Sequence, residues 1–238
     1  MMLSHPGCRH ANAYSAASAD STGLPFRTGI RKSTRMSKTS GDYSASHWLE
    51  VLRTTEIADR RWKKAVKSLT EMGLRAVPAL IEAEGDDNQT VCIGASKALQ
   101  QIGPATVPFL IKALRHENPR IREIAARGLY GHAPNAQKAI SALTDALQDS
   151  DAFVRKWIAV ALEALAYHFG PILKVAVPGL SDLLKDEDWA VREWAAHALG
   201  SIGTVADAAL PALQSALEDE EPVVRQAAAE ALSKIQKS

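Results

Sequence analysis

The sequence predicts an all-α protein in which helical pairs stack into an α-solenoid, a right-handed superhelix, after a disordered N-terminal tail. Three observations predict this fold. Apolar residues recur at helical spacing from Trp48 onwards. A nine-residue motif that begins with Val-Arg, called here the Val-Arg phrase, is repeated along the chain and is clearest at residues 191–199 and 224–232. Helix-opening residues, usually proline, recur 30 to 37 residues apart, and a period of this size with two helices per unit is typical of a solenoid.

Residues 1–45 are predicted to form the tail. They are rich in Ser, Thr, Ala and Gly and lack periodicity, so they cannot bury enough apolar surface to offset their ordering entropy. Six basic residues against two acidic ones also make the segment similar to an organelle transit peptide. A third interpretation is that translation starts at Met36. We expect a cytoplasmic protein, with organelle import through residues 1–45 left open.

Residues 46–238 are predicted to form about six helical pairs. The first helix of a pair opens with an apolar residue and proline, as at Val177-Pro178, because the missing N–H of proline costs nothing in a first turn. An acidic turn follows, and the second helix carries the Val-Arg phrase and ends near a glycine such as Gly103 or Gly203. The expected units are approximately residues 46–75, 76–106, 107–138, 139–174, 175–208 and 209–238.

The phrases starting at Val177-Pro178 and at Val191-Arg192 resemble HEAT repeats. More narrowly, they resemble the short, alanine-rich subclass found in phycobilin lyases and in many bacterial and archaeal scaffold proteins. The resemblance covers about 190 of the 238 residues. It implies that the second helices line a concave face. Because the shared residues are those that pack the helices together, the resemblance implies an architecture more than a function.

Arginine and aspartate recur at fixed places in the repeat and are predicted to form a structural ladder. The resemblance implies that each arginine meets a carboxylate in an acidic turn, that of a neighbouring unit. The alternative is a basic ladder that binds phosphates or substrate carboxylates, but nearby acids favour the structural role. The residues of this ladder are Arg122, Arg155, Arg192, Arg225, Asp149, Asp186 and Asp219.

Aromatic and charged residues of the second helices form the predicted binding surface. Trp157 and Trp194 share one position, two residues after the repeat arginine. Either both rings fill gaps between repeats, or they form an aromatic seam at the edge of the concave face. The fourth unit is about one helical turn longer and adds Tyr167. The predicted binding residues are Arg127, Trp157, Glu193, Trp194, His197 and Tyr167.

No catalytic, cofactor or metal site is expected, because the sequence lacks a Gly-rich phosphate loop, a Ser/His/Asp or Cys/His arrangement and zinc-ligand spacing. His116-Glu117 is one His-Glu pair, expected to be solvent-exposed in a turn. The chain resembles deoxyhypusine hydroxylase in architecture, but that family uses repeated His-Glu pairs to hold two irons. Cys92 stands where other units carry arginine and is expected to be a packed thiol.

Three functions are compatible with these observations. The favoured one is a non-catalytic scaffold, expected to be a monomer, that binds a protein or peptide on its concave face. The second, implied by the repeat subclass alone, is a phycobilin lyase-like subunit that handles a chromophore. The third is a helical-repeat DNA-binding or repair protein, which the excess of 25 acidic over 22 basic residues after residue 45 disfavours. No membrane partner is expected, because no apolar run approaches about 20 residues.

Overall fold

The computed structural model describes residues 43–236, so the predictions for residues 1–42 lie outside it. Every regular element in residues 43–236 is a helix, which confirms the predicted all-α fold. The helical pairs are α1 (Ala45–Arg53) with α2 (Arg60–Glu71), α3 (Val77–Glu84) with α4 (Gln89–Ile102), α5 (Val107–Ala113) with α6 (Pro119–Gly131), α7 (Ile140–Asp145) with α8 (Ala152–Phe169), α9 (Val177–Leu183) with α10 (Trp189–Ile202), and α11 (Leu210–Ala216) with α12 (Pro222–Gln236).

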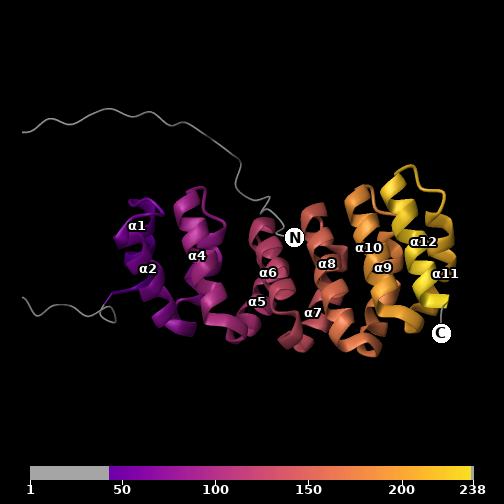
Figure 1. Cartoon of the computed structure of the whole chain (residues 1–238), viewed down its shortest axis with the longest axis horizontal. Coiled ribbons are helices and arrows are strands. Elements are labelled where there is room, and N and C mark those ends of the chain that lie inside the picture. The colour runs from indigo at the N-terminus through magenta and orange to yellow at the C-terminus, as the bar shows by residue number, and fades with distance from the viewer. Residues whose placement is uncertain (1–42, 237–238) are drawn as a thin grey trace, which may run out of the picture. The chain divides into compact units, whose positions relative to one another are not determined.

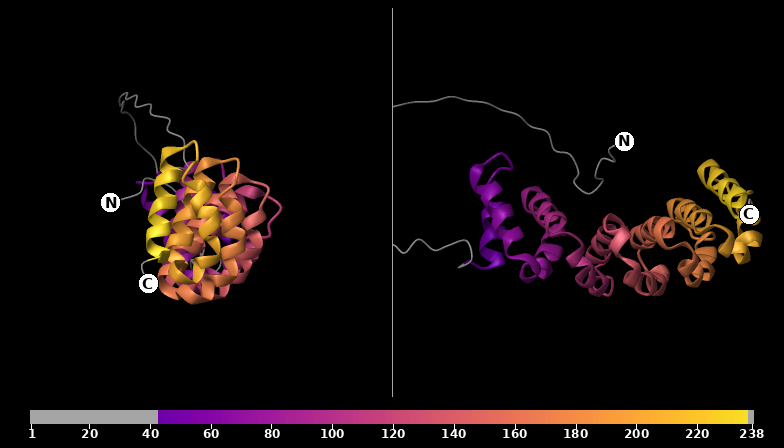
Figure 2. Two further views of the ribbon diagram at one scale, coloured as in Figure 1. Left: turned by 90° about the vertical axis from the view of Figure 1, so that its right-hand side faces the viewer. Right: turned by 60° about the horizontal axis from the view of Figure 1, so that its bottom comes forward.

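The pairs within this part of the chain follow one another in a row, in sequence order (Figure 1). The second helices α6, α8, α10 and α12 each pack extensively against the next, and Figure 2 shows that the row curves. Short 3-10 helices connect or extend the pairs. They are η2 (Gly73–Arg75), η3 (Gly103–Thr106), η4 (Ala133–Asn135), η5 (Gln137–Ala139), η6 (Ala146–Gln148), η7 (Gly170–Ala176) and η8 (Gly203–Ala209).

Helix ends follow the signals in the sequence. Gly103 and Gly203 have φ angles of 78° and 73°, a region that favours glycine, and they end α4 and α10. The carboxylates of Asp151 and Asp188 accept hydrogen bonds from backbone N–H groups in the first turns of α8 and α10. These caps fix where each second helix begins and therefore which side chains it presents.

Small residues let the second helices approach one another closely. Gly200 in α10 faces Ala231 in α12, and Ala231 is buried between these two helices. A Cβ atom added to Gly200 would lie 2.9 Å from the Cα of Ala231, a distance that real Cβ contacts do not reach. The alanine-rich composition therefore has a direct packing consequence, because larger side chains would push the helices apart.

Helix α8 corrects one expectation from the sequence. The run Ala152–Leu183, which includes α8, contains an 18-residue stretch apolar enough to cross a membrane by length and composition, so the expectation that no run approaches this limit is wrong. Many apolar side chains of α8 lie in the core, among them Val154, Ile158 and Leu162, and α8 packs against both α6 and α10. Packing on two sides explains the composition of this helix.

Arg155 connects two consecutive units. Its Nε and Nη2 donate to Oδ2 and Oδ1 of Asp186 at 2.6 and 2.8 Å, and its Nη1 donates to the backbone carbonyl of Asp149 at 2.9 Å. The two paired side chains are only 11% and 7% exposed. A bidentate pair of this kind fixes the position of one turn relative to the next. The same pairing joins Arg122 to Asp149 and Arg192 to Asp219.

Arg225, in the last pair, differs from the other repeat arginines. Its Nη1 donates to the backbone carbonyls of Asp219 and Glu220 at 2.6 and 2.9 Å. It forms no ion pair with a carboxylate among residues 43–236, in which α12 is the last helix. Arg225 therefore keeps the contact within its own unit and lacks the contact between units.

The pKa values of the paired carboxyl groups are lowered. Burial raises the pKa of Asp186, but hydrogen bonds from Arg155 and from the backbone N–H of Asp188 outweigh it. For Asp219 the hydrogen bond from Arg192 has the largest effect and lowers the pKa. A carboxyl group whose folded pKa lies below its unfolded value stabilises the fold at every pH above the unfolded value.

We predict that Arg155→Met lowers the free energy of unfolding by about 3 kcal/mol, because it leaves the carboxylate of Asp186 largely buried without its partner. Arg225→Met is the matched control, and it should cost about 1 kcal/mol because only hydrogen bonds to backbone carbonyls are lost. Urea denaturation followed by circular dichroism measures both. Equal losses in the two variants would contradict a role between units.

We also predict that stability falls as the pH drops below about 4, the ordinary pKa of an unfolded aspartate. The lowered pKa values of Asp149, Asp186 and Asp219 mean that their stabilisation is complete above this value and is lost as the pH falls through their folded pKa values. Melting temperatures measured across this range should show a smaller acid-induced decrease for Arg155→Met than for the unmodified chain. Identical pH profiles would count against the ladder as the source.

Candidate binding surface on the second helices

Four of the predicted binding residues lie together on the solvent side of the second helices, which we call the second-helix face. Arg127 is in α6, Trp157 in α8, and Trp194 and His197 in α10; all four are half-buried. Both tryptophans stand two residues after their ladder arginine, and His197 follows Trp194 by three residues, which places the two on one side of the helix. The ladder aligns these helices, so equivalent positions form rows across the face.

The ring of Trp157 is the centre of a contact cluster. The guanidinium carbon of Arg127 lies 5.7 Å from the ring centroid, and the ammonium of Lys156 lies 5.8 Å from it. The ring of Tyr130 approaches edge-on, with 6.3 Å between the centroids. Cation–π and edge-to-face contacts hold the indole in place. The sequence left open whether Trp157 fills a gap between repeats or lies at the edge of the concave face. The half-buried ring has both properties, because it packs against its neighbours and is still in contact with solvent.

A second, smaller group surrounds Trp194. The ring of His197 lies 5.5 Å from the Trp194 ring, tilted by 56°. Glu193 is half-buried on the same helix and makes no ion pair within residues 43–236. On α12, Glu230 takes the position of His197 relative to the ladder arginine and accepts a hydrogen bond from Gln226 at 2.9 Å. Two cations therefore lie against the ring of Trp157, whereas the charged residue next to Trp194 in sequence is Glu193.

Tyr167 lies away from both groups. It is near the C-terminal end of α8, its side chain is 86% exposed, and its ring meets that of His168 edge-on at 5.1 Å. The extra length predicted for the fourth unit is present, since α8 has 18 residues and α10 has 14. Within the described residues, Tyr167 makes no ring contact with either tryptophan of the second-helix face.

Three residues of this face were not selected from the sequence. Phe153 is 62% exposed, with the ammonium of Lys156 4.9 Å from its ring centroid. Tyr130 is 39% exposed and contacts Trp157 across two helices. Glu123 forms an ion pair with Arg127, with 3.6 Å between the charged atoms. Helical spacing could have predicted two of these residues from the sequence, because Tyr130 follows Arg127 by three residues and Phe153 precedes Trp157 by four.

His116 and Cys92 lie elsewhere, at the junction of the second and third pairs. His116 was expected to be solvent-exposed, but its side chain is 33% exposed and its Nε2 lies 3.2 Å from a carboxylate oxygen of Glu82. The half-buried Cys92 donates from Sγ to the carbonyl of Glu84 at 3.2 Å. Within residues 43–236, no three His, Cys, Asp or Glu side chains are grouped so that they could hold a metal ion.

Comparison with known proteins agrees with this architecture. The sequence profile described as HEAT repeats matches residues 45–129, 107–174 and 159–233. No curated protein matches the chain. Among solved structures, the complex of CpcE and CpcF of phycocyanin lyase from Nostoc sp. PCC7120 is 28% identical with a TM-score of 0.55, and the match covers 66% of this chain and 97% of that chain.

Engineered and designed repeat proteins share the fold. An engineered protein is 25% identical with a TM-score of 0.52, and the match covers 80% of this chain and 96% of that chain. A designed armadillo repeat protein in complex with the peptide (KR)4 is 17% identical with a TM-score of 0.54, covering 81% of this chain and 100% of that chain, which shows the fold alone. The repeated helical pairs and the profile matches across residues 45–233 lead to one conclusion: this chain belongs to the HEAT-repeat family.

Proposed function

We propose that the protein is a non-catalytic interaction scaffold, and that its second helices line a concave face that binds an extended peptide segment of a partner protein. The observation that carries this proposal is the cluster of Arg127, Tyr130 and Trp157. Tryptophan, tyrosine and arginine are the residue types that dominate binding energy at interfaces. Their mutual contacts restrict their rotamers before binding, so little further entropy is lost when a ligand arrives.

The charges on the face define the kind of peptide. An apolar or aromatic side chain would stack on Trp157, and a carboxylate beside it would pair with Arg127 or Lys156. A basic side chain farther along would reach Glu193, next to Trp194 in α10, or Glu230 in α12. A designed armadillo repeat protein that shares the fold is in complex with the peptide (KR)4, so peptide binding is compatible with this architecture. The preferred ligand is therefore a peptide with one acidic and one basic region around an apolar residue.

A second candidate function follows from the similarity to the phycocyanin lyase complex of CpcE and CpcF. In this case the second-helix face would hold a bilin, with Trp157 and Trp194 against the ring system and Arg127 against a propionate. Incubation of the protein with a bilin and an apo-phycobiliprotein, followed by absorbance, tests this function. Covalent chromophore transfer would favour the lyase, and its absence together with peptide binding would favour the scaffold.

We predict that Trp157→Ala and Trp194→Ala each lower the free energy of unfolding by only about 1 to 2 kcal/mol, because both rings are half-buried. The comparison variant is Trp62→Ala. Trp62 is 2% exposed and its Nε1 donates to the carbonyl of Thr90 at 3.0 Å, so its loss should cost about 3 to 5 kcal/mol. Denaturation midpoints give the order. A loss for Trp157→Ala as large as that for Trp62→Ala would make Trp157 a core residue.

We further predict that peptides selected from a random displayed library on the unmodified protein bind at least about tenfold more weakly to Trp157→Ala, which corresponds to about 1.4 kcal/mol. Fluorescence anisotropy with a labelled peptide measures the affinity. Trp189→Ala is the control, because Trp189 is 48% exposed but stands at the start of α10, outside the cluster. Peptides that lose affinity for Trp189→Ala and keep it for Trp157→Ala would refute this site.

A further inference from the structure

The junction between the second and third helical pairs departs from the rest of the array. Cys92 takes the place of the ladder arginine in α4. His116 takes the place of the ladder aspartate, since its Nδ1 accepts from the backbone N–H of Asn118 at 3.1 Å as Asp186 accepts from Asp188. Both halves of the ion pair are thus replaced at one junction. In agreement, α4 and α6 make little contact, whereas α6, α8, α10 and α12 pack extensively in succession.

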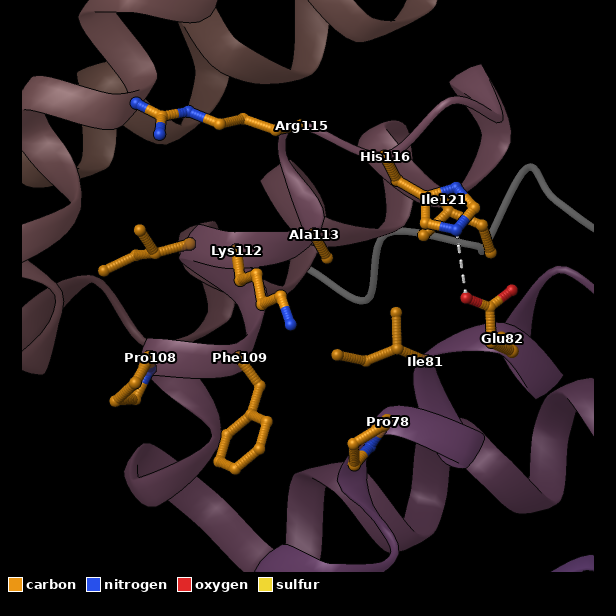
Figure 3. Close-up of a pocket in the computed structure, with 11 residues that line it drawn as sticks. Pro78, Ile81, Glu82, Pro108, Phe109, Lys112, Ala113, Arg115, His116 and Ile121 are labelled. Carbon is orange, nitrogen blue, oxygen red and sulfur yellow. Dashed lines mark ion pairs between the residues drawn. The ribbon is translucent and has the colours of Figure 1, made fainter.

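A cavity of about 740 Å³ opens at this junction between the first helices α3 and α5 (Figure 3). Its volume lies in the range of sites that bind small molecules. Phe109 and Pro78 point into the same space as Ile81. The apolar residues of its lining are Pro78, Ile81, Pro108, Phe109, Ile111, Ala113 and Ile121. These residues belong to the first helices or to the start of α6, so the cavity is separate from the second-helix face.

The apolar lining is specific to this junction and is not a general feature of the repeat. Four residues after the first residue of the helix, the first helices of the last three pairs carry a polar residue: Thr144, Ser181 and Gln214. The corresponding residues in α3 and α5 are Ile81 and Ile111. Two residues after the first residue of the helix, α3, α7, α9 and α11 carry Ala79, Ala142, Gly179 and Ala212. In α5 this residue is Phe109. Phe109 and Ile111 are half-buried and therefore occupy places that packing of the array does not require, whereas Ile81 is buried in the core and forms the floor of the cavity.

The charged groups around the cavity leave one cation available. Glu82 is engaged by His116: because the Nδ1 of His116 accepts a hydrogen bond, its Nε2 carries the proton that faces Glu82. Arg115 extends away from the cavity towards Asp145, with 3.7 Å between the charged atoms. The ammonium of Lys112 is directed into the cavity and makes no ion pair within residues 43–236.

We infer that this cavity binds a small amphipathic anion, a compound with an aromatic or branched apolar body and one carboxylate group. The apolar body contacts Ile81, Phe109 and Ile111, and the carboxylate pairs with Lys112. Burial of the apolar body supplies affinity, and the ion pair, partly shielded from water by the apolar walls, supplies selectivity for an anion. This inference does not depend on peptide binding at the second-helix face.

Isothermal titration of the full-length protein with 2-naphthoate tests the inference. The variants Phe109→Ala and Ile111→Ser introduce residue types that other pairs carry at these positions, so the fold tolerates them, and thermal melting verifies this. Each variant is expected to weaken binding by about tenfold, as is Lys112→Glu. Lys185→Glu is the control, because Lys185 is an exposed lysine after α9 and should leave the affinity unchanged.

Two ligand analogues separate the contributions of charge and shape. The alcohol 2-naphthalenemethanol keeps the ring and should bind about tenfold more weakly to the unmodified protein, and 2-naphthylmethylammonium should bind more weakly still. The inference is overturned if no 2-naphthoate binds, if Lys185→Glu weakens binding as much as Lys112→Glu, or if the ammonium compound binds most tightly. Anion binding that requires Phe109, Ile111 and Lys112 supports it.

Discussion

An arginine that reaches from one helical pair into the turn of the next determines the geometry of this array. The carboxylate of Asp186 shows how much depends on the contact, because it receives two hydrogen bonds from Arg155 and one from the backbone N–H of Asp188. Asp188 in turn caps α10. The carboxylate of Asp186 therefore closes the turn and binds the preceding unit, and the carboxylate of Asp188, held in the same turn, determines where the next helix begins. Desolvation of both charges offsets much of their attraction, so the pair fixes spacing more than it adds net stability.

Because the spacing between the second helices is fixed, the side chains of the repeated motif form a continuous surface. With the second helices aligned, residues at one position of the phrase form a row: five residues after the ladder arginine stand Arg127, the buried Val160, His197 and Glu230. The charge changes along this row from basic to acidic while the neighbouring apolar positions stay constant. The packing residues of the repeat and its surface residues thus vary independently, which lets one fold present many different faces.

The sequence was sufficient to predict the features that repeat. It was insufficient to predict contacts that depend on how neighbouring helices are rotated about their axes. Gly103, Gly203 and the arginine positions were evident because each copy of the phrase confirms the others. Helical spacing places Tyr130 on the same side of α6 as Arg127, but the repeat does not encode its contact with Trp157, which joins α6 to α8. The equivalence of His116 with the ladder aspartates was missed for another reason. It stands six residues before Arg122, as each ladder aspartate stands six residues before an arginine, but an imidazole replaces the carboxylate, and the shared hydrogen bond to the backbone shows that they correspond.

The break in the ladder also limits how the two candidate sites can influence each other. From Arg122 onwards the second helices are joined by ion pairs, so Trp157 and Trp194 keep their relative position whatever occupies the cavity between α3 and α5. Arg127 differs, because it also lines a groove of about 180 Å³ between α4 and α6. A ligand that draws α3 and α5 together would narrow or widen this groove. Arg127 lines this groove and also contacts Trp157, so we expect any coupling between the two sites to involve Arg127.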